Sequence, residues 1–211
     1  MFYFVKKPVW LRKFYGDATW QVATTDKVLY LTFDDGPDPE ATPFVLEQLE
    51  KYNAKATFFC IGRNVEQHQQ LFAEVVSQGH AVGNHTYSHI DGWKTNNKKY
   101  FSDIATASSL IQSDLFRPPY GHVTWRQVNL LKNNEQPLRT FLWSVLSADF
   151  DENTPEEKCL YNVTTHAGEG DIVLFHDSKG AMKNLRYALP RVLQHYTQQG
   201  FRFQALPQVQ P

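Results

Sequence analysis

Two neighbouring acids and two histidines are the residues of this chain whose types and spacing suggest chemistry most directly. Asp34 and Asp35 end an apolar run, and His85 and His89 follow further along the chain, four positions apart. Histidines at this spacing lie on one face of a helix or a tight turn. One carboxylate with two imidazoles makes the three-ligand set that a catalytic zinc-type site uses while it keeps a position open for water. The other carboxylate is then free to act as a base, so the pattern predicts a metal-assisted hydrolase.

A turn must follow the two acids directly if both are to serve one site. Neighbouring side chains of a strand point to opposite faces of a sheet, and Gly36 and Pro37 break the strand just after Asp35. Aspartates in such a position are also common as plain turn formers. The acids therefore become a candidate site only through their combination with the two histidines.

The segment Arg117-Pro118-Pro119-Tyr120 is expected to be rigid and extended, because each proline fixes its own backbone and restrains the residue before it. Prolines have no backbone N–H, so Tyr120 carries the first donor after them. The segment is either an ordinary stiff loop or a preset donor aimed at a developing oxyanion. In the second case we expect Arg117 to pair with an acid across the site.

A further histidine, His176, follows the apolar run that ends at Phe175. Alone it would be read as a surface histidine. With a metal site on the same face, we expect it to act as a general acid. Asp149 is then a candidate either to orient the His176 imidazole or to pair with Arg117.

The elements that must position these residues alternate between strand and helix along the chain. Alternation of this kind implies parallel strands in an open doubly wound sheet or a closed barrel. The candidate residues follow the ends of expected strands, the face on which barrel enzymes build their sites, and this favours an α/β protein with a (β/α) barrel. The expected strands are 28–33, 56–61, 81–83, 115–117, 140–145, 172–175 and 201–205, and the expected helices are 42–52, 65–78, 100–111, 124–132, 155–166 (capped by Thr154) and 185–199.

The bulk composition is that of an ordinary soluble domain. The chain has 211 residues, 20% of them charged, and a net charge of −1, which gives no long-range attraction to nucleic acid or an anionic membrane. Cys60 and Cys159 make no disulfide framework and are expected to be structural. The first residues are too interrupted by charge for a secretory signal or a membrane span. We therefore expect a cytoplasmic or membrane-peripheral protein, or a cell-envelope protein if a leader has been removed.

Four motifs in order resemble those of the polysaccharide deacetylases, the NodB-homology domain of carbohydrate esterase family 4. Together they cover roughly residues 28–206, nearly the whole chain. They are Thr32-Phe33-Asp34-Asp35, His85-Thr86-Tyr87-Ser88-His89, Arg117-Pro118-Pro119-Tyr120 and Leu174-Phe175-His176.

The resemblance implies a distorted (β/α) barrel with its active site at the C-terminal strand ends. It also implies a divalent metal, usually Zn²⁺ with Co²⁺, Ni²⁺ or Mn²⁺ as alternatives, bound by Asp35, His85 and His89. Three further roles follow from it: Asp34 as catalytic base, the Tyr120 N–H in the oxyanion hole and His176 as general acid. In such a mechanism we expect Arg117 to hold Asp34 ionised and in place, because a neighbouring cation favours the charged carboxylate.

One family motif is altered in this chain. Where the family has Asp-x-x-Asp-Trp, this sequence has Leu146, Asp149 and Phe150. The second acid is kept, the first is lost, and Phe150 can still form an apolar wall for an acetyl group or a sugar face. The departure bears on substrate preference more than on catalysis.

The predicted function is metal-dependent hydrolysis of a linear amide, the N-acetyl group of amino sugars in a peptidoglycan- or chitin-type polymer or oligomer. The alternatives are O-acetyl xylan, a small lipid-linked or cyclic amide substrate, or a non-catalytic carbohydrate-binding relic. We expect residues 28–206 to form a single catalytic domain, with 1–27 packing on the barrel and 207–211 as a tail. No nucleic-acid partner or transmembrane segment is expected, and the oligomeric state is left open but compatible with a monomer.

Overall fold

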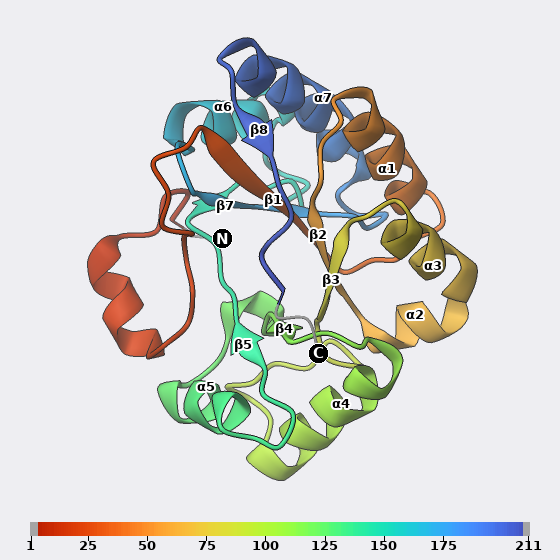
Figure 1. Cartoon of the computed structure of the whole chain (residues 1–211), viewed down its shortest axis with the longest axis vertical. Coiled ribbons are helices and arrows are strands. Elements are labelled where there is room, and N and C mark those ends of the chain that lie inside the picture. The colour runs from red at the N-terminus through yellow and green to blue at the C-terminus, as the bar shows by residue number, and fades with distance from the viewer. Residues whose placement is uncertain (1–3, 209–211) are drawn as a thin grey trace.

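The computed structural model describes residues 4–208, which form a curled parallel sheet surrounded by helices (Figure 1). The strands are β1 (Val28–Asp34), β2 (Thr57–Cys60), β3 (Ala81–Asn84), β4 (Leu115–Phe116), β5 (Arg139–Thr140), β6 (Val145–Leu146), β7 (Ile172–His176) and β8 (Arg202–Phe203). The helices are α1 (Ala41–Lys51), α2 (Gly62–Gln67), α3 (Gln69–Ser77), α4 (Asn97–Leu110), α5 (Trp125–Lys132), α6 (Glu156–His166) and α7 (Met182–Gln198), with 3₁₀ turns η1 (Val9–Tyr15) and η2 (Pro119–Gly121).

The strand order is β5-β4-β3-β2-β1-β7-β6, and β8 pairs with the start of β1. Every paired strand runs parallel to its neighbour. The two end strands of this order, β5 and β6, are not paired with each other, so the barrel is incomplete. The expected distorted (β/α) barrel is therefore confirmed.

The central strand β1 explains why the sheet needs cover on both faces. All seven of its residues are buried, in a nearly continuous apolar run typical of parallel strands. The Phe33 ring stacks on Phe58 at 5.2 Å and on Phe175 at 6.0 Å, so one side chain joins the two neighbouring strands. This packed centre fixes β1, and with it the acid at its end.

Segments from both ends of the chain pack against the incomplete barrel. Thr19 bridges to Phe141, in the link between β5 and β6, and Lys6 bridges to Val145, at the start of β6. After β8 the chain crosses the strands toward the C-terminus (Figure 1), and the Leu206 N–H donates to Thr57 Oγ1 at 2.8 Å. The division into an extension at 1–27, a domain at 28–206 and a tail at 207–211 stays a prediction, and residues 1–3 and 209–211 lie outside the described chain.

Three local expectations were wrong. The helix expected at 65–78 is two helices, α2 and α3, because His68 between them has the non-helical backbone angles φ −126° and ψ 48°. The strand expected at 140–145 is split into β5 and β6, which lie at opposite ends of the strand order. Helix α6 begins at Glu156 with Pro155 at its N-cap, so Thr154 lies one residue too early to cap it.

No helix within residues 4–208 is long and apolar enough to cross a membrane.

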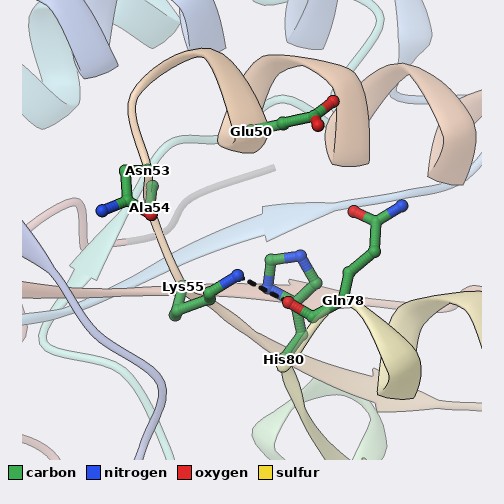
Figure 2. A pocket seen from close by; sticks show the side chains of 6 residues that line it. All are labelled: Glu50, Asn53, Ala54, Lys55, Gln78 and His80. Atoms are coloured by element: carbon green, nitrogen blue, oxygen red, sulfur yellow. Dashed lines mark hydrogen bonds between the residues drawn. The ribbon is translucent and has the colours of Figure 1, made fainter.

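A hollow of about 360 Å³ is present at the end of the barrel where the strands begin (Figure 2). Its lining includes Lys55, which donates to Gln78 O, and His80, whose Nδ1 accepts from the Ala56 N–H at 3.2 Å. Because residues at the N-terminal face of a barrel mainly serve stability, we assign this hollow no chemistry.

His80 should make the fold sensitive to mild acid. Burial, with the nearby Lys55 charge, lowers the pKa of His80 to about 4. The unfolded chain binds this proton from about pH 6.5 downward, so stability should fall as the pH falls from 6.5 to 4. The variant His80→Gln keeps an acceptor for the Ala56 N–H but does not take up this proton. Between pH 6.5 and 4, its free energy of unfolding should therefore fall by about 1–2 kcal/mol less than that of the wild type.

Urea unfolding at pH 7 and pH 4.5 measures this difference. His195→Gln, in α7, is the matched control and should follow the wild-type pH dependence. If the free energy of unfolding falls equally in the wild type and in His80→Gln, His80 is not the source of the acid sensitivity.

Candidate active site

The carboxyl ends of five strands bring the candidate residues to one edge of the sheet. Asp34 ends β1 and His176 ends the neighbouring β7, and the strand register pairs these two residues. His85 follows β3, Arg117 follows β4, and Asp149 lies three residues after β6. Parallel strands present all their carboxyl ends on the same side, so the alternation of strands and helices gathers these side chains.

Asp35, His85 and His89 form a cluster that fits a divalent cation. Their ligand atoms all lie within 4.8 Å of one another. Asp35 Oδ1 lies 3.1 Å from His89 Nε2 and 3.6 Å from His85 Nε2. This oxygen is buried, and no described group makes a hydrogen bond to it. One carboxylate and two imidazoles are a suitable donor set for zinc-type ions, and the unpaired Asp35 oxygen is available as a ligand.

The protonation states of the cluster also suit a cation. Burial, opposed by Asp34, lowers the pKa of His85 to about 4, so this imidazole is neutral near pH 7. His85 Nδ1 lies 2.8 Å from Arg117 O, and its N–H donates to that carbonyl, which leaves the Nε2 lone pair for a metal. Burial alone would raise the pKa of Asp35, but its contact with His89 and the nearby His176 hold that pKa well below its usual range.

The backbone around the site is strained in the left-handed region. Positive φ is uncommon for residues other than glycine, and such strain concentrates at functional sites. Except for Asn53, all the described non-glycine residues with positive φ lie in the loops at this edge of the sheet. They are Asp35 (81°), Thr86 (62°), His89 (57°), Tyr120 (61°) and Ala148 (66°).

Hydrogen bonds from side chains of neighbouring helices hold these strained loops. Asn64 Nδ2 donates to Asp35 O at 2.7 Å. Asp103 Oδ1 accepts from the backbone N–H groups of Tyr87 and Ser88, at 2.7 and 2.9 Å. The metal-ligand turns are therefore fixed from neighbouring helices, which sequence spacing alone did not indicate.

Arg117 is completely buried and pairs with Asp34. Its Nη1 donates to Asp34 Oδ1 at 2.8 Å and to Thr32 Oγ1 at 2.7 Å. Its Nε and Nη2 donate to the carbonyls of Phe141 and Leu142. Arg117 thus pairs with Asp34, the acid it was expected to hold, and the alternative pairing with Asp149 is not seen among the described residues.

Asp149 instead orients His176. Its Oδ1 lies 2.8 Å from His176 Nδ1, and its Oδ2 accepts from the His176 backbone N–H at 2.8 Å. Ser147 Oγ donates to Asp149 Oδ1, and Asn184 Nδ2 donates to the Asp149 carbonyl, so the acid is held on several sides. Burial opposes protonation of the imidazole, but the Asp149 charge and hydrogen bond, with Asp35 and Asp34, raise the pKa of His176 to about 9.

Tyr120 lies beside the metal-ligand cluster with its side chain exposed. Its ring centroid is 4.7 Å from that of His89. Its φ of 61° turns the chain just after Pro119. Within the described chain the Tyr120 N–H is paired with no acceptor, so it is available to a bound molecule.

Sequence reasoning missed Asp177, which holds the turn after Asp35. Asp177 is fully buried, and its carboxyl group accepts from the Gly36 N–H at 3.1 Å and from Thr42 Oγ1 at 2.6 Å. A Cβ on Gly36 would lie 2.0 Å from Asp177, so only glycine fits this position. Burial raises the pKa of Asp177 well above its usual range. Its position directly after the candidate His176 was the one sequence feature that could have pointed to Asp177.

The residues of the altered motif have separate surroundings. Leu146 is buried in an apolar cluster that includes Trp20 and Leu174. Phe150 is 37% exposed, and its ring centroid lies 5.1 Å from that of His176. Leu146 therefore packs the interior, whereas Phe150 borders the site.

The pair Arg117–Asp34 leads to a stability prediction. Arg117→Met should lower the free energy of unfolding by about 3–5 kcal/mol, because it leaves the buried Asp34 charge without its partner. The double variant Arg117→Met/Asp34→Asn should recover part of this loss. Denaturant unfolding measures both, and a double variant no more stable than the single one would contradict charge burial as the cause.

Comparison with known proteins agrees with this arrangement. The family model for polysaccharide deacetylase matches residues 21–138, more than half of the chain. A peptidoglycan-N-acetylglucosamine deacetylase of Bacillus cereus is 36% identical over 194 residues, which cover 89% of this chain and 90% of the relative. A chitooligosaccharide deacetylase of Azorhizobium caulinodans is 31% identical over 205 residues, covering 89% and 96%.

A crystal structure shares both the fold and its extent. It is that of the Bc1960 peptidoglycan N-acetylglucosamine deacetylase in complex with 4-naphthalen-1-yl-N-oxidanyl-benzamide. It superposes with a TM-score of 0.85 at 30% identity and covers 95% of each chain. The motifs, the fold and these similarities together lead to one conclusion: this chain belongs to the polysaccharide deacetylase family.

Proposed function

We propose that this protein is a metal-dependent deacetylase that hydrolyses the N-acetyl groups of amino sugars in a peptidoglycan- or chitin-type glycan. One observation carries the proposal. A carboxylate held by a buried arginine, Asp34, lies next to the ligand set Asp35, His85 and His89, and its Oδ2 is 3.8 Å from His85 Nε2. The names of the relatives support an acetylated N-acetylglucosamine polymer or oligomer as the substrate.

Asp35, His85 and His89 would hold the cation, for which Zn²⁺ is our choice because the donors are one carboxylate and two imidazoles. When bound there, a divalent ion supplies Lewis-acid polarisation of the amide carbonyl and lowers the pKa of water. Co²⁺, Ni²⁺ and Mn²⁺ accept similar donors, so the metal content of the protein must decide among them.

Asp34 is the base in this proposal. Its Oδ1 is engaged by Arg117, which leaves Oδ2 on the side of His85 and the ligand set. The attacking water gives its proton to this oxygen as its own oxygen bonds to the carbonyl carbon. The buried guanidinium fixes the direction of this carboxylate through its hydrogen bond to Oδ1.

Tyr120 and His176 supply the two remaining roles, the oxyanion donor and the general acid. The unpaired Tyr120 N–H donates to the carbonyl oxygen as negative charge develops on it. His176 is protonated at neutral pH and gives its proton to the amide nitrogen as the carbon–nitrogen bond breaks. The products are acetate and a free amine on the sugar.

The two neighbouring acids give an asymmetric test. Purified wild-type protein should carry about one divalent ion per chain and release acetate from N-acetylglucosamine oligomers. His85→Ala and Asp35→Asn should lose the metal. Asp34→Asn should keep it and lose about 10²–10⁴-fold in kcat.

Metal analysis and an acetate assay on the same samples check each variant. The assay should include O-acetyl xylan and small lipid-linked and cyclic amides beside the amino-sugar substrates. A wild-type protein without metal, or an Asp34→Asn variant with full activity, would contradict the proposal. Sugar binding without acetate release would favour a carbohydrate-binding role instead.

The ion pair of His176 with Asp149 predicts a pH dependence. Activity requires the protonated imidazole, so it should fall as the pH rises through the pKa of His176, about 9. Asp149→Asn removes the main charge that raises this pKa, and the basic limb of kcat/KM should move about 1–2 units to lower pH. An unchanged basic limb in this variant would exclude His176 as the general acid.

A further inference from the structure

A row of aromatic rings leads away from the metal-ligand cluster. The ring centroid of Tyr120 lies 4.7 Å from that of His89 and 5.7 Å from that of His122. His122 in turn stacks on Trp93, with 3.9 Å between centroids and 6° between planes. We call Tyr120, His122 and Trp93 the aromatic ledge. It joins the loop after β3 to the loop after β4, the two loops that carry His89 and Tyr120.

The outer end of the ledge is fixed by hydrogen bonds. Asp91 Oδ2 lies 3.0 Å from His122 Nδ1, and Asp91 Oδ1 accepts from the Trp93 N–H at 2.9 Å. Gln127 Nε2 donates to Gly92 O at 3.0 Å. A Cβ on Gly92 would lie 2.4 Å from His122 O, so the two loops approach as closely as a glycine allows. One acid therefore fixes both the imidazole and the backbone beneath the tryptophan.

The ledge is nevertheless exposed. Trp93 is 55% exposed and Tyr120 is 59% exposed, although each is held by its neighbours. Large exposed aromatic side chains next to a site commonly mark a ligand-binding surface. Because these rings are already ordered, a ligand that stacks on them loses little affinity to ordering of the protein.

We propose that the aromatic ledge binds the sugar units that flank the one being deacetylated. A pyranose ring has an apolar C–H face and polar edges, which suits a flat ring whose borders remain in water. Tyr120, the inner member of the ledge, contacts His89, but in the described chain Trp93 makes no ring contact with His89 or Tyr120. Its outer ring therefore meets a neighbouring unit and not the reacting one.

The ligand class is a chain of N-acetylated hexosamine units rather than a monosaccharide. This inference rests on the proposed function, since it places the reacting unit beside His89 and Tyr120. Asp91, Trp93 and His122 thereby become determinants of substrate length. They take no part in the bond-breaking steps.

A length series of substrates tests the ledge. Wild-type kcat/KM should rise from N-acetylglucosamine to its tetramer. Trp93→Ala should lose about five- to tenfold of kcat/KM on the tetramer, mainly through a higher KM. Trp93→Tyr should restore most of this loss, because it keeps a stacking ring.

Trp10→Ala is the matched control. Trp10 lies in η1, is 58% exposed and has its ring contact with Phe14, so its removal should leave the length dependence unchanged. Circular dichroism of each variant identifies loss of fold. Equal kinetics of Trp93→Ala and wild type at every length would overturn the inference.

Binding measured without turnover separates the ledge from the proposed reaction. Calorimetry with the tetramer, in an Asp34→Asn background, should give a Kd about five- to tenfold weaker when Trp93→Ala is added. If the wild type releases no acetate but Trp93→Ala still weakens binding of the tetramer, the role of the ledge in sugar binding is supported and the proposed function is contradicted. If acetate is released but Trp93 has no effect on binding or KM, only the ledge fails.

Discussion

The buried ion pair of Arg117 with Asp34 is the interaction on which the rest of the site depends. Arg117 follows β4 and Asp34 ends β1, and two strands separate β4 from β1 in the sheet. The curl of the sheet lets one side chain span them. The same guanidinium donates to the carbonyls of Phe141 and Leu142, in the link between β5 and β6. A charge so deeply buried is tolerated only when its donors are satisfied, and here they join three parts of an incomplete barrel.

Backbone strain and its support form the second constraint. Asp35 and His89 have positive φ, and so does Tyr120, the member of the ledge that directly follows the two prolines. Such conformations persist only when the surroundings fix them. Here Asn64, Asp103 and buried Asp177 supply the fixing hydrogen bonds. The turns that aim the ligand atoms are thus set by residues that take no direct part in chemistry.

Three aspartates at one edge of the sheet differ through their partners. Asp34 faces an arginine, and Asp149 faces an imidazole whose pKa it raises to about 9. Asp177 has hydroxyl and amide donors but pairs with no cation of the described chain, and burial raises its pKa well above the usual range. These surroundings give the three acids different tasks: Asp34 is held by an arginine, Asp149 orients an imidazole, and Asp177 braces a turn. Residue type alone does not distinguish them.

The sequence by itself determined the class of fold and most of the candidate residues, because strand–helix periodicity and polar residues at strand ends are local signals. It did not decide the break at His68 or the separation of β5 from β6. It missed Asp177 and the pairing of Asp91 with His122. Asp177 and Asp91 meet partners that are distant in the chain, and only the tertiary structure brings them together. The spacing of residues in the sequence can place a side chain at one edge of the sheet. Which group it contacts across the site is decided by the tertiary structure.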